Sequence, residues 1–299
     1  MKSKFLLITA LLVIVCVFTD NISAFSQEII KLYPAQVANS KPTEKAETFD
    51  RGMYRNVTEP TLEYIKPEKP NGTAVIVIAG GGYAVIVYNG EGLGTAKSLA
   101  EKGISTFVLK YRLPSDEIMQ DKKIGPLQDA QQAIKYLREN AEKYGIDKNK
   151  IGIMGFSAGG HLASTAATHF EKSYIENPQN TNLRPDFQVL VYPVITMQDA
   201  LTHGGSRDAL IGKTPSQEDK DLFSNELQVK ANTPITWLTH AADDKVVDVD
   251  NSIQYFEKLR KSKVEVEMHI FPKGDHGFIF RQKGWTDPLF DWMKRNNLL

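Results

Sequence analysis

Short apolar runs rich in Val and Ile alternate with amphipathic stretches along most of the chain. The apolar runs predict strands at Thr73–Ala79, Ser105–Lys110, Ile151–Gly155, Gln188–Tyr192, Ile235–His240 and Val264–Phe271. The stretches between them have the periodicity of helices, at Leu93–Lys102, Leu127–Lys143, Gly159–His169, Asn251–Lys261 and Leu289–Asn296. Continuous apolar strands that alternate with helices indicate a mostly parallel sheet covered on both faces, and therefore one α/β domain.

Two segments depart from this alternation. Gln27–Asn71 is polar and rich in proline, and we expect an extended leader with one or two antiparallel edge strands, one of them Thr61–Ile65. Residues 194–234 have no strand pattern and only short helical pieces, around Arg207–Ile211 and Ser216–Leu222. Long connections of this kind are often functional, so we expect either a lid over a site or a surface subdomain with a packing role.

The N-terminus has the layout of a secretory signal. Two lysines precede the apolar run Phe5–Phe18, and Ala24-Phe25-Ser26 provides a small-x-small cleavage site. The run is shorter than the roughly 20 residues that span a bilayer, so a membrane anchor is the weaker alternative. We expect residues 1–26 to be a signal peptide and residues 27–299 to be one domain, exported to the periplasm or beyond without stable membrane association.

The composition argues against nucleic-acid binding and against sites that depend on cysteine. The 299 residues carry 36 basic and 36 acidic side chains, which gives no basic surface for nucleic acid. The single cysteine, Cys16, lies in the expected signal segment, and Val15 before it disfavours a lipoprotein site. A mature chain without cysteine has no disulfide, thiol nucleophile or cysteine-bound metal.

The strongest chemical signal is Gly155-Phe156-Ser157-Ala158-Gly159, which follows a predicted strand and opens a predicted helix. In this context the G-x-S-x-G pattern is typical of a sharp turn that exposes a nucleophilic serine, Ser157. The alternative is a turn of small residues that only packs the helix on the strand.

A serine nucleophile requires a base, and His276 is the best candidate among six histidines. It lies between Gly274 and Gly277 in a loop just past the last predicted strand. We expect structural roles for His240 and His269, which lie on strands. The remaining histidines are His161 and His169 on the helix after Ser157, and His203 in the 194–234 segment.

An acid that orients the histidine is expected after the preceding strand, where Asp243 and Asp244 both stand. Asp244 is favoured because it directly precedes a Lys-Val-Val turn, whereas Asp243 is better placed to cap the loop. The resulting order Ser157, Asp244, His276 matches that of α/β-hydrolases.

Ala79-Gly80-Gly81-Gly82-Tyr83 follows the first predicted parallel strand. Glycines there let backbone N–H groups approach an oxyanion, and we assign that role to Gly81, Gly82 and Ala158. A phosphate-binding loop is disfavoured because the G-x-G-x-x-G pattern fails at Val85. No metal-binding spacing is present, so no metal or cofactor is expected. Tyr83, His203 and Arg207 are the expected substrate contacts.

Several motifs together resemble exported α/β-hydrolases of the acetylxylan-esterase type. They are Ala79–Tyr83, Lys110–Pro114, Leu127–Ala130, Ile153–His161, Arg184–Phe187, Tyr192–Ile195, Phe223–Glu226 and the loops that carry Asp244 and His276. The resemblance covers about Leu62 to Phe280 and implies the α/β-hydrolase fold and a carbohydrate esterase. Ala79 and Lys245 depart from the usual family residues but remove no catalytic atom.

The sequence therefore predicts a secreted serine esterase that removes O-acetyl groups from a xylan-type polysaccharide or its oligosaccharides. A general short-chain carboxylesterase or a feruloyl esterase would use the same residues. A peptidase is disfavoured because the chain lacks room for the extra domain of such enzymes. A non-catalytic glycan-binding protein of the same fold is the alternative from another class.

Overall fold

The computed structural model describes residues 27–299, so the expected signal segment lies outside the described residues. The strands are β1 (Gln27–Lys31), β2 (Thr48–Asp50), β3 (Met53–Arg55), β4 (Thr61–Ile65), β5 (Ala74–Ile78), β6 (Ser105–Lys110), β7 (Ile151–Phe156), β8 (Phe187–Val191), β9 (Ile235–Ala241) and β10 (Val266–Phe271). The α-helices are α1 (Thr95–Ala100), α2 (Gly125–Glu139), α3 (Ser157–Thr168), α4 (Gly204–Ile211), α5 (Gln217–Phe223), α6 (Asp250–Lys261) and α7 (Asp287–Arg295).

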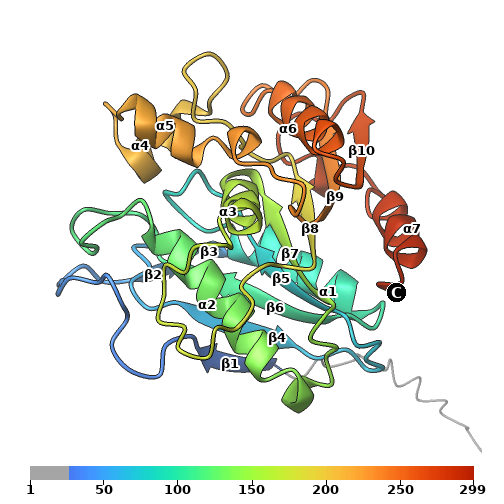
Figure 1. Ribbon diagram of the computed structural model, residues 1–299, viewed down its shortest axis with the longest axis horizontal. Coiled ribbons are helices and arrows are strands. Elements are labelled where there is room, and N and C mark those ends of the chain that lie inside the picture. Colours follow the sequence, from blue (N-terminus) through green and yellow to red (C-terminus); the bar gives the residue numbers. More distant parts are fainter. Residues whose placement is uncertain (1–26) are drawn as a thin grey trace, which may run out of the picture.

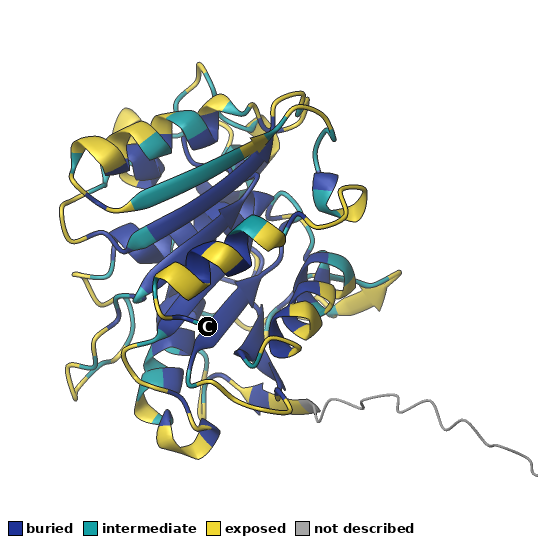
Figure 2. Cartoon of the chain, turned by 90° about the vertical axis from the view of Figure 1, so that its right-hand side faces the viewer, coloured by how far each residue is buried: buried dark blue, intermediate teal, exposed yellow. Residues whose placement is uncertain are grey.

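Eight strands form one sheet in the order β1-β4-β6-β5-β7-β8-β9-β10. β4 pairs antiparallel with both neighbours, and the other pairs are parallel. The central strands β5, β6 and β7 are buried along their whole length because helices lie on both sides of the sheet (Figures 1 and 2). The α/β fold expected from the alternation of strands and helices is therefore confirmed.

Helices α2 and α3 lie side by side across one face of the sheet, and α1 lies on the other (Figure 1). Helix α3 is buried along its whole length, whereas the C-terminal helix α7 has one buried and one exposed face (Figure 2). At the edge, β10 is only half-buried. Within residues 27–299, no helix has both the length and the apolar character needed to cross a bilayer.

The leader adds more structure than its composition predicted. β1 is the true edge strand, so Thr61–Ile65 lies one position inside the edge, and β2 and β3 form a separate hairpin. The leader is fixed by Arg112, a wholly buried residue just after β6 that forms an ion pair with Asp129 of α2 at 2.7 Å. The Arg112 guanidinium also donates to the carbonyl of Ala38 and to the hydroxyl of Ser40.

The helix predicted at Leu93–Lys102 is shorter than expected. A π-helical turn, Tyr88–Gly94, takes its first part and leads into α1. Such turns are rare and are often found at functional sites. The helix predicted at Leu127–Lys143 begins at Gly125 and ends at Glu139, with a separate 3₁₀ turn at Glu142–Tyr144.

Candidate active site

The turn between β7 and α3 places Ser157 at the carboxyl edge of the sheet. Ser157 has a left-handed φ of 51°, a conformation that serine rarely adopts outside such strained turns. Glycine is required on both sides of it. A Cβ at Gly155 would lie 2.2 Å from the carbonyl oxygen of Gly159, and one at Gly159 would lie 2.3 Å from that of Ile78. The motif therefore forms the strand–turn–helix that its sequence predicted.

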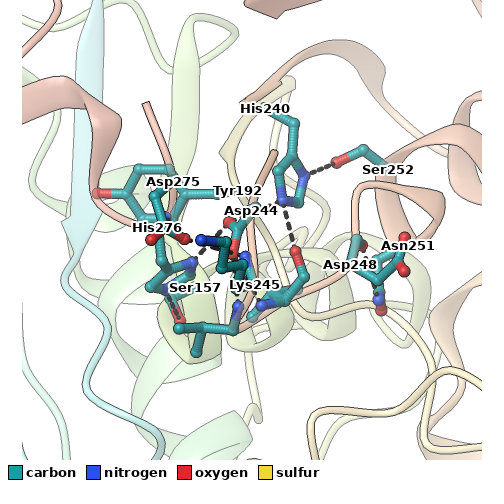
Figure 3. Close-up of polar contacts among 12 residues, drawn as sticks. Ser157, Tyr192, His240, Asp244, Lys245, Asp248, Asn251, Ser252, Asp275 and His276 are labelled. Atoms are coloured by element: carbon teal, nitrogen blue, oxygen red, sulfur yellow. Dashed lines mark hydrogen bonds and ion pairs between the residues drawn. The ribbon is translucent and has the colours of Figure 1, made fainter. Parts of the chain in front are cut away.

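Two further loops bring His276 and Asp244 to this serine (Figure 3). His276 Nε2 lies 2.9 Å from Ser157 Oγ, and His276 Nδ1 lies 2.8 Å from Asp244 Oδ2. The histidine loop follows β10, and the aspartate loop follows β9. The three residues thus form a continuous chain of hydrogen bonds that orients the imidazole toward the serine hydroxyl.

Asp244 is held in an environment that favours its charged form. Its side chain is fully buried, and its Oδ1 accepts the backbone N–H groups of Val246 and Val247 at 2.9 and 3.0 Å. Burial alone would raise the pKa of Asp244. Hydrogen bonds from His240, His276 and Val247 outweigh that effect and hold the pKa well below its usual value.

Asp243 has a different position, exposed to solvent. Its Oδ1 accepts the backbone N–H of Asp275 at 2.8 Å, which joins the aspartate loop to the histidine loop. Asp275 in turn accepts the N–H of Lys245 at 3.0 Å. Asp244, rather than Asp243, is therefore the aspartate that contacts His276.

The glycine loop after β5 runs beside the serine. Gly81 has a φ of 126°, and a Cβ there would lie 2.3 Å from the carbonyl oxygen of Val85. The carbonyl oxygen of Gly81 accepts the N–H groups of Ala84 and Val85, which closes the turn. Within residues 27–299, the backbone N–H groups of Gly81, Gly82 and Ala158 have no protein acceptor. They remain available to a ligand oxygen.

The three expected substrate contacts have different surroundings. His203 is half-buried, and its ring would lie 3.9 Å from a Cβ placed on Gly82. Burial lowers its pKa, and the proximity of His276 lowers it further. Arg207, by contrast, bonds to Asp199 at 2.7 Å and lies beside Asp208, so its guanidinium is used within the 194–234 segment.

Tyr83 also differs from the expectation. Its side chain is 2% exposed, and its hydroxyl lies 2.8 Å from His161 Nδ1. The residue forms part of the wall of a cavity of about 180 Å³ beside the glycine loop. The hydroxyl of Tyr83 is therefore already bonded within the protein. A larger cavity of about 630 Å³ lies between residues 33–40 and α2, and neither Ser157, Asp244 nor His276 lines it.

A family model named BD-FAE matches residues 63–259, which includes Ser157, Asp244 and the glycine loop. The chain belongs to this family. An acetylxylan esterase of Xylanibacter ruminicola is 37% identical over 218 residues, covering 72% of this chain and 42% of that protein. Endo-1,4-beta-xylanase B of Butyrivibrio fibrisolvens is also 37% identical, covering 75% of this chain and 36% of that protein. This BD-FAE chain thus spans less than half the length of these two relatives.

Solved structures agree with this assignment. An acetyl ester-xyloside bifunctional hydrolase from Caldicellulosiruptor lactoaceticus matches with a TM-score of 0.76 and 34% identity, over 91% of this chain and 97% of that one. The expected resemblance to α/β-hydrolases of the acetylxylan-esterase type is confirmed. A thermophilic esterase from Thermogutta terrifontis, at 21% identity and a TM-score of 0.67, supports the same fold.

Three residues of this BD-FAE site are not among those that the sequence predicts to form it. Glu91, in the π-helical turn, accepts the N–H of Gly80 at 2.6 Å and the hydroxyl of Tyr192 at 3.0 Å. The ring of Tyr192 lies 4.7 Å from that of His276. His240, expected to be structural, lies 3.1 Å from Asp244 Oδ2. The only available signal was that each is a polar residue close to a strand end or a glycine loop.

Among the described residues, no group of three or more His, Cys, Asp or Glu side chains could hold a metal ion.

Proposed function

We propose that this BD-FAE protein is a serine esterase in which Ser157, His276 and Asp244 form the catalytic triad. The observation that carries the proposal is the hydrogen-bond chain from Ser157 Oγ through the His276 ring to Asp244 Oδ2, at 2.9 and 2.8 Å. Distances of this size are those at which a base accepts the proton of a nucleophile.

The proposed reaction is a two-step acyl transfer. Asp244 accepts the Nδ1–H of His276, which leaves Nε2 free to take the Ser157 proton as Oγ attacks the ester carbonyl. The N–H groups of Gly81, Gly82 and Ala158 stabilise the oxyanion. His276 then protonates the leaving alcohol. It afterwards takes a proton from the water that attacks the acyl-enzyme and gives this proton to Ser157 Oγ as the acid leaves, which regenerates the hydroxyl.

We propose an O-acetyl group on a xylan-type polysaccharide or its oligosaccharides as the substrate. The acetylxylan esterase and the acetyl ester-xyloside hydrolase among the relatives support this choice. The order of basic, apolar and small residues in positions 1–26 supports an exported enzyme that meets such polymers. A general short-chain carboxylesterase is the second candidate, because the triad itself does not select the alcohol.

The test is acetate release from acetylated xylan by the wild type and by Ser157→Ala, with a chain-length series of nitrophenyl esters in parallel. Ser98→Ala, an exposed serine of α1, is the matched control. Release that depends on Ser157 supports both proposals. Nitrophenyl acetate hydrolysis without release from xylan would retain the mechanism and exclude xylan. No Ser157-dependent hydrolysis of either would contradict the esterase proposal and favour a glycan-binding protein.

A further inference from the structure

Asp244 is in contact with two histidines. Its Oδ2 lies 2.8 Å from Nδ1 of His276 and 3.1 Å from Nε2 of His240, and Figure 3 shows the two rings approaching the carboxylate from different sides. His240 stands at the end of β9, four residues before Asp244, and is fully buried. The proposed reaction assigns it no role.

The partners of His240 determine where its proton lies. Nε2 is within hydrogen-bond distance of Asp244 Oδ2 and of the carbonyl oxygen of Val247, at 3.0 Å, and both atoms only accept. Nε2 therefore carries a proton. Nδ1 lies 2.8 Å from Oγ of Ser252, a buried residue of α6 whose hydroxyl can donate. A neutral His240 thus has both ring nitrogens satisfied, with a fixed tautomer.

We propose that His240, oriented by Ser252, is a positioning residue that fixes the Asp244 carboxylate in the orientation from which it accepts the Nδ1–H of His276. The inference rests on the proposed triad. Val246 and Val247 already hold Oδ1 through their N–H groups, so His240 completes the hydrogen bonding of Oδ2. With a donor on each lone pair, the carboxylate has a single favoured rotation.

Removal of the His240 donor has two consequences. The buried carboxylate gains rotational freedom, so His276 is less often aligned with Ser157. The carboxylate also becomes a more basic partner, which stabilises the protonated form of His276 and moves the acid limb of kcat/KM to higher pH. The other ionisable groups near this pair stay the same in the variant: Glu91, Tyr192, His203, Asp275 and Arg281.

The experiment compares His240→Met with His240→Gln. Glutamine can place an N–H close to the position of the imidazole Nε2, whereas methionine fills a similar volume without a donor. With nitrophenyl acetate, we expect His240→Met to lose about 10- to 100-fold in kcat, by analogy with the loss seen when a partner that orients a metal ligand is removed. KM should change little, and the acid limb should rise. His240→Gln should recover most of the kcat and the wild-type profile.

His169→Met is the matched control, since His169 is a buried histidine that bonds to α3 and to Leu222, away from the triad. If His240→Met folds and keeps the wild-type kcat and pH profile, the inference is wrong. Equal losses in the methionine and glutamine variants without a shift of the acid limb would also contradict it, because they would indicate packing alone. If His240→Met does not fold, Ser252→Ala must show the same rise of the acid limb for the inference to hold. Wild-type hydrolysis that does not depend on Ser157 would instead contradict the triad, and the inference with it.

Discussion

Glu91 offers a sharp test of how the glycine loop, which carries two of the proposed oxyanion donors, is held. Its buried carboxylate accepts the N–H of Gly80 at 2.6 Å and the hydroxyl of Tyr192 at 3.0 Å. Burial is the largest effect and raises the pKa of Glu91 above its usual value, although these two hydrogen bonds and the nearby His276 act in the opposite direction. The Glu91 side chain thus connects Gly80, the residue before Gly81, with Tyr192, whose ring packs on His276.

The loss of stability on removing this carboxylate follows from the two donors. Glu91→Leu leaves the Gly80 N–H and the Tyr192 hydroxyl buried without partners, at about 1–3 kcal/mol each. Part of this cost is offset because the variant no longer buries an ionisable group. We therefore expect the free energy of unfolding to fall by about 2–4 kcal/mol. Glu91→Gln keeps an acceptor for Gly80 and supplies a donor to Tyr192, so the loss should be below about 1.5 kcal/mol.

The effect on activity follows from the neighbouring Gly81. Full removal of an oxyanion donor lowers kcat by about 10²–10³, and a displaced loop weakens such a donor without removing it. We expect Glu91→Leu to lower kcat about 10- to 100-fold with little change in KM.

Urea denaturation and nitrophenyl acetate kinetics measure both effects, with Glu101→Leu, an exposed glutamate after α1, as control. A Glu91→Leu variant that is destabilised but keeps full kcat would refute the inference that Glu91 positions the glycine loop for catalysis.

Three further predictions concern the triad and the pH dependence of stability. Ser157→Ala and His276→Ala should each lower kcat by roughly 10⁴–10⁶-fold in steady-state kinetics, whereas His169→Met should keep a kcat close to that of the wild type. Asp244→Asn should lower kcat by about 10³–10⁴-fold, and Asp243→Asn by less than about tenfold; the reverse order would mean that the acid is wrongly assigned. Burial lowers the pKa of His161 to about 4, so the unfolded chain binds its proton first and stability is lost as the pH falls from 6.5 toward 4. Denaturation at several pH values should show a contribution of roughly 3 kcal/mol from this residue, and a His161→Gln variant with an unchanged slope would exclude it.

The parts of the fold that the sequence predicted well are those set by short-range pattern. Ser105–Lys110 and Thr61–Ile65 are strands with the predicted bounds, because apolar, aromatic and β-branched residues dominate both runs. The structure also brings Ser157, Asp244 and His276 together. Each follows a separate parallel strand, and the carboxyl ends of parallel strands meet at one edge of the sheet.

The contacts that could not be predicted from the sequence depend on tertiary packing, which determines the direction of each side chain. Tyr83 has a positive φ of 60°, and its hydroxyl is bonded to His161 on α3, a contact that depends on the packing of the glycine loop against that helix. Glu91 lies in a π-helical turn, which no local pattern predicts. His240 lies on a strand, as the sequence predicts, but its contact with Asp244 depends on the path of the loop after β9.

The two adjacent aspartates show why chemistry alone could not separate their roles. The Asp244 side chain is buried, and two imidazoles and two backbone N–H groups surround its carboxylate. Asp243 faces solvent and accepts the N–H of Asp275, directly before His276. Asp275 accepts in return from the N–H of Lys245, so reciprocal bonds join the two loops. Asp243 therefore helps to place the histidine through the backbone, whereas Asp244 orients its ring, and substitutions at the two positions should differ in kind as well as in size.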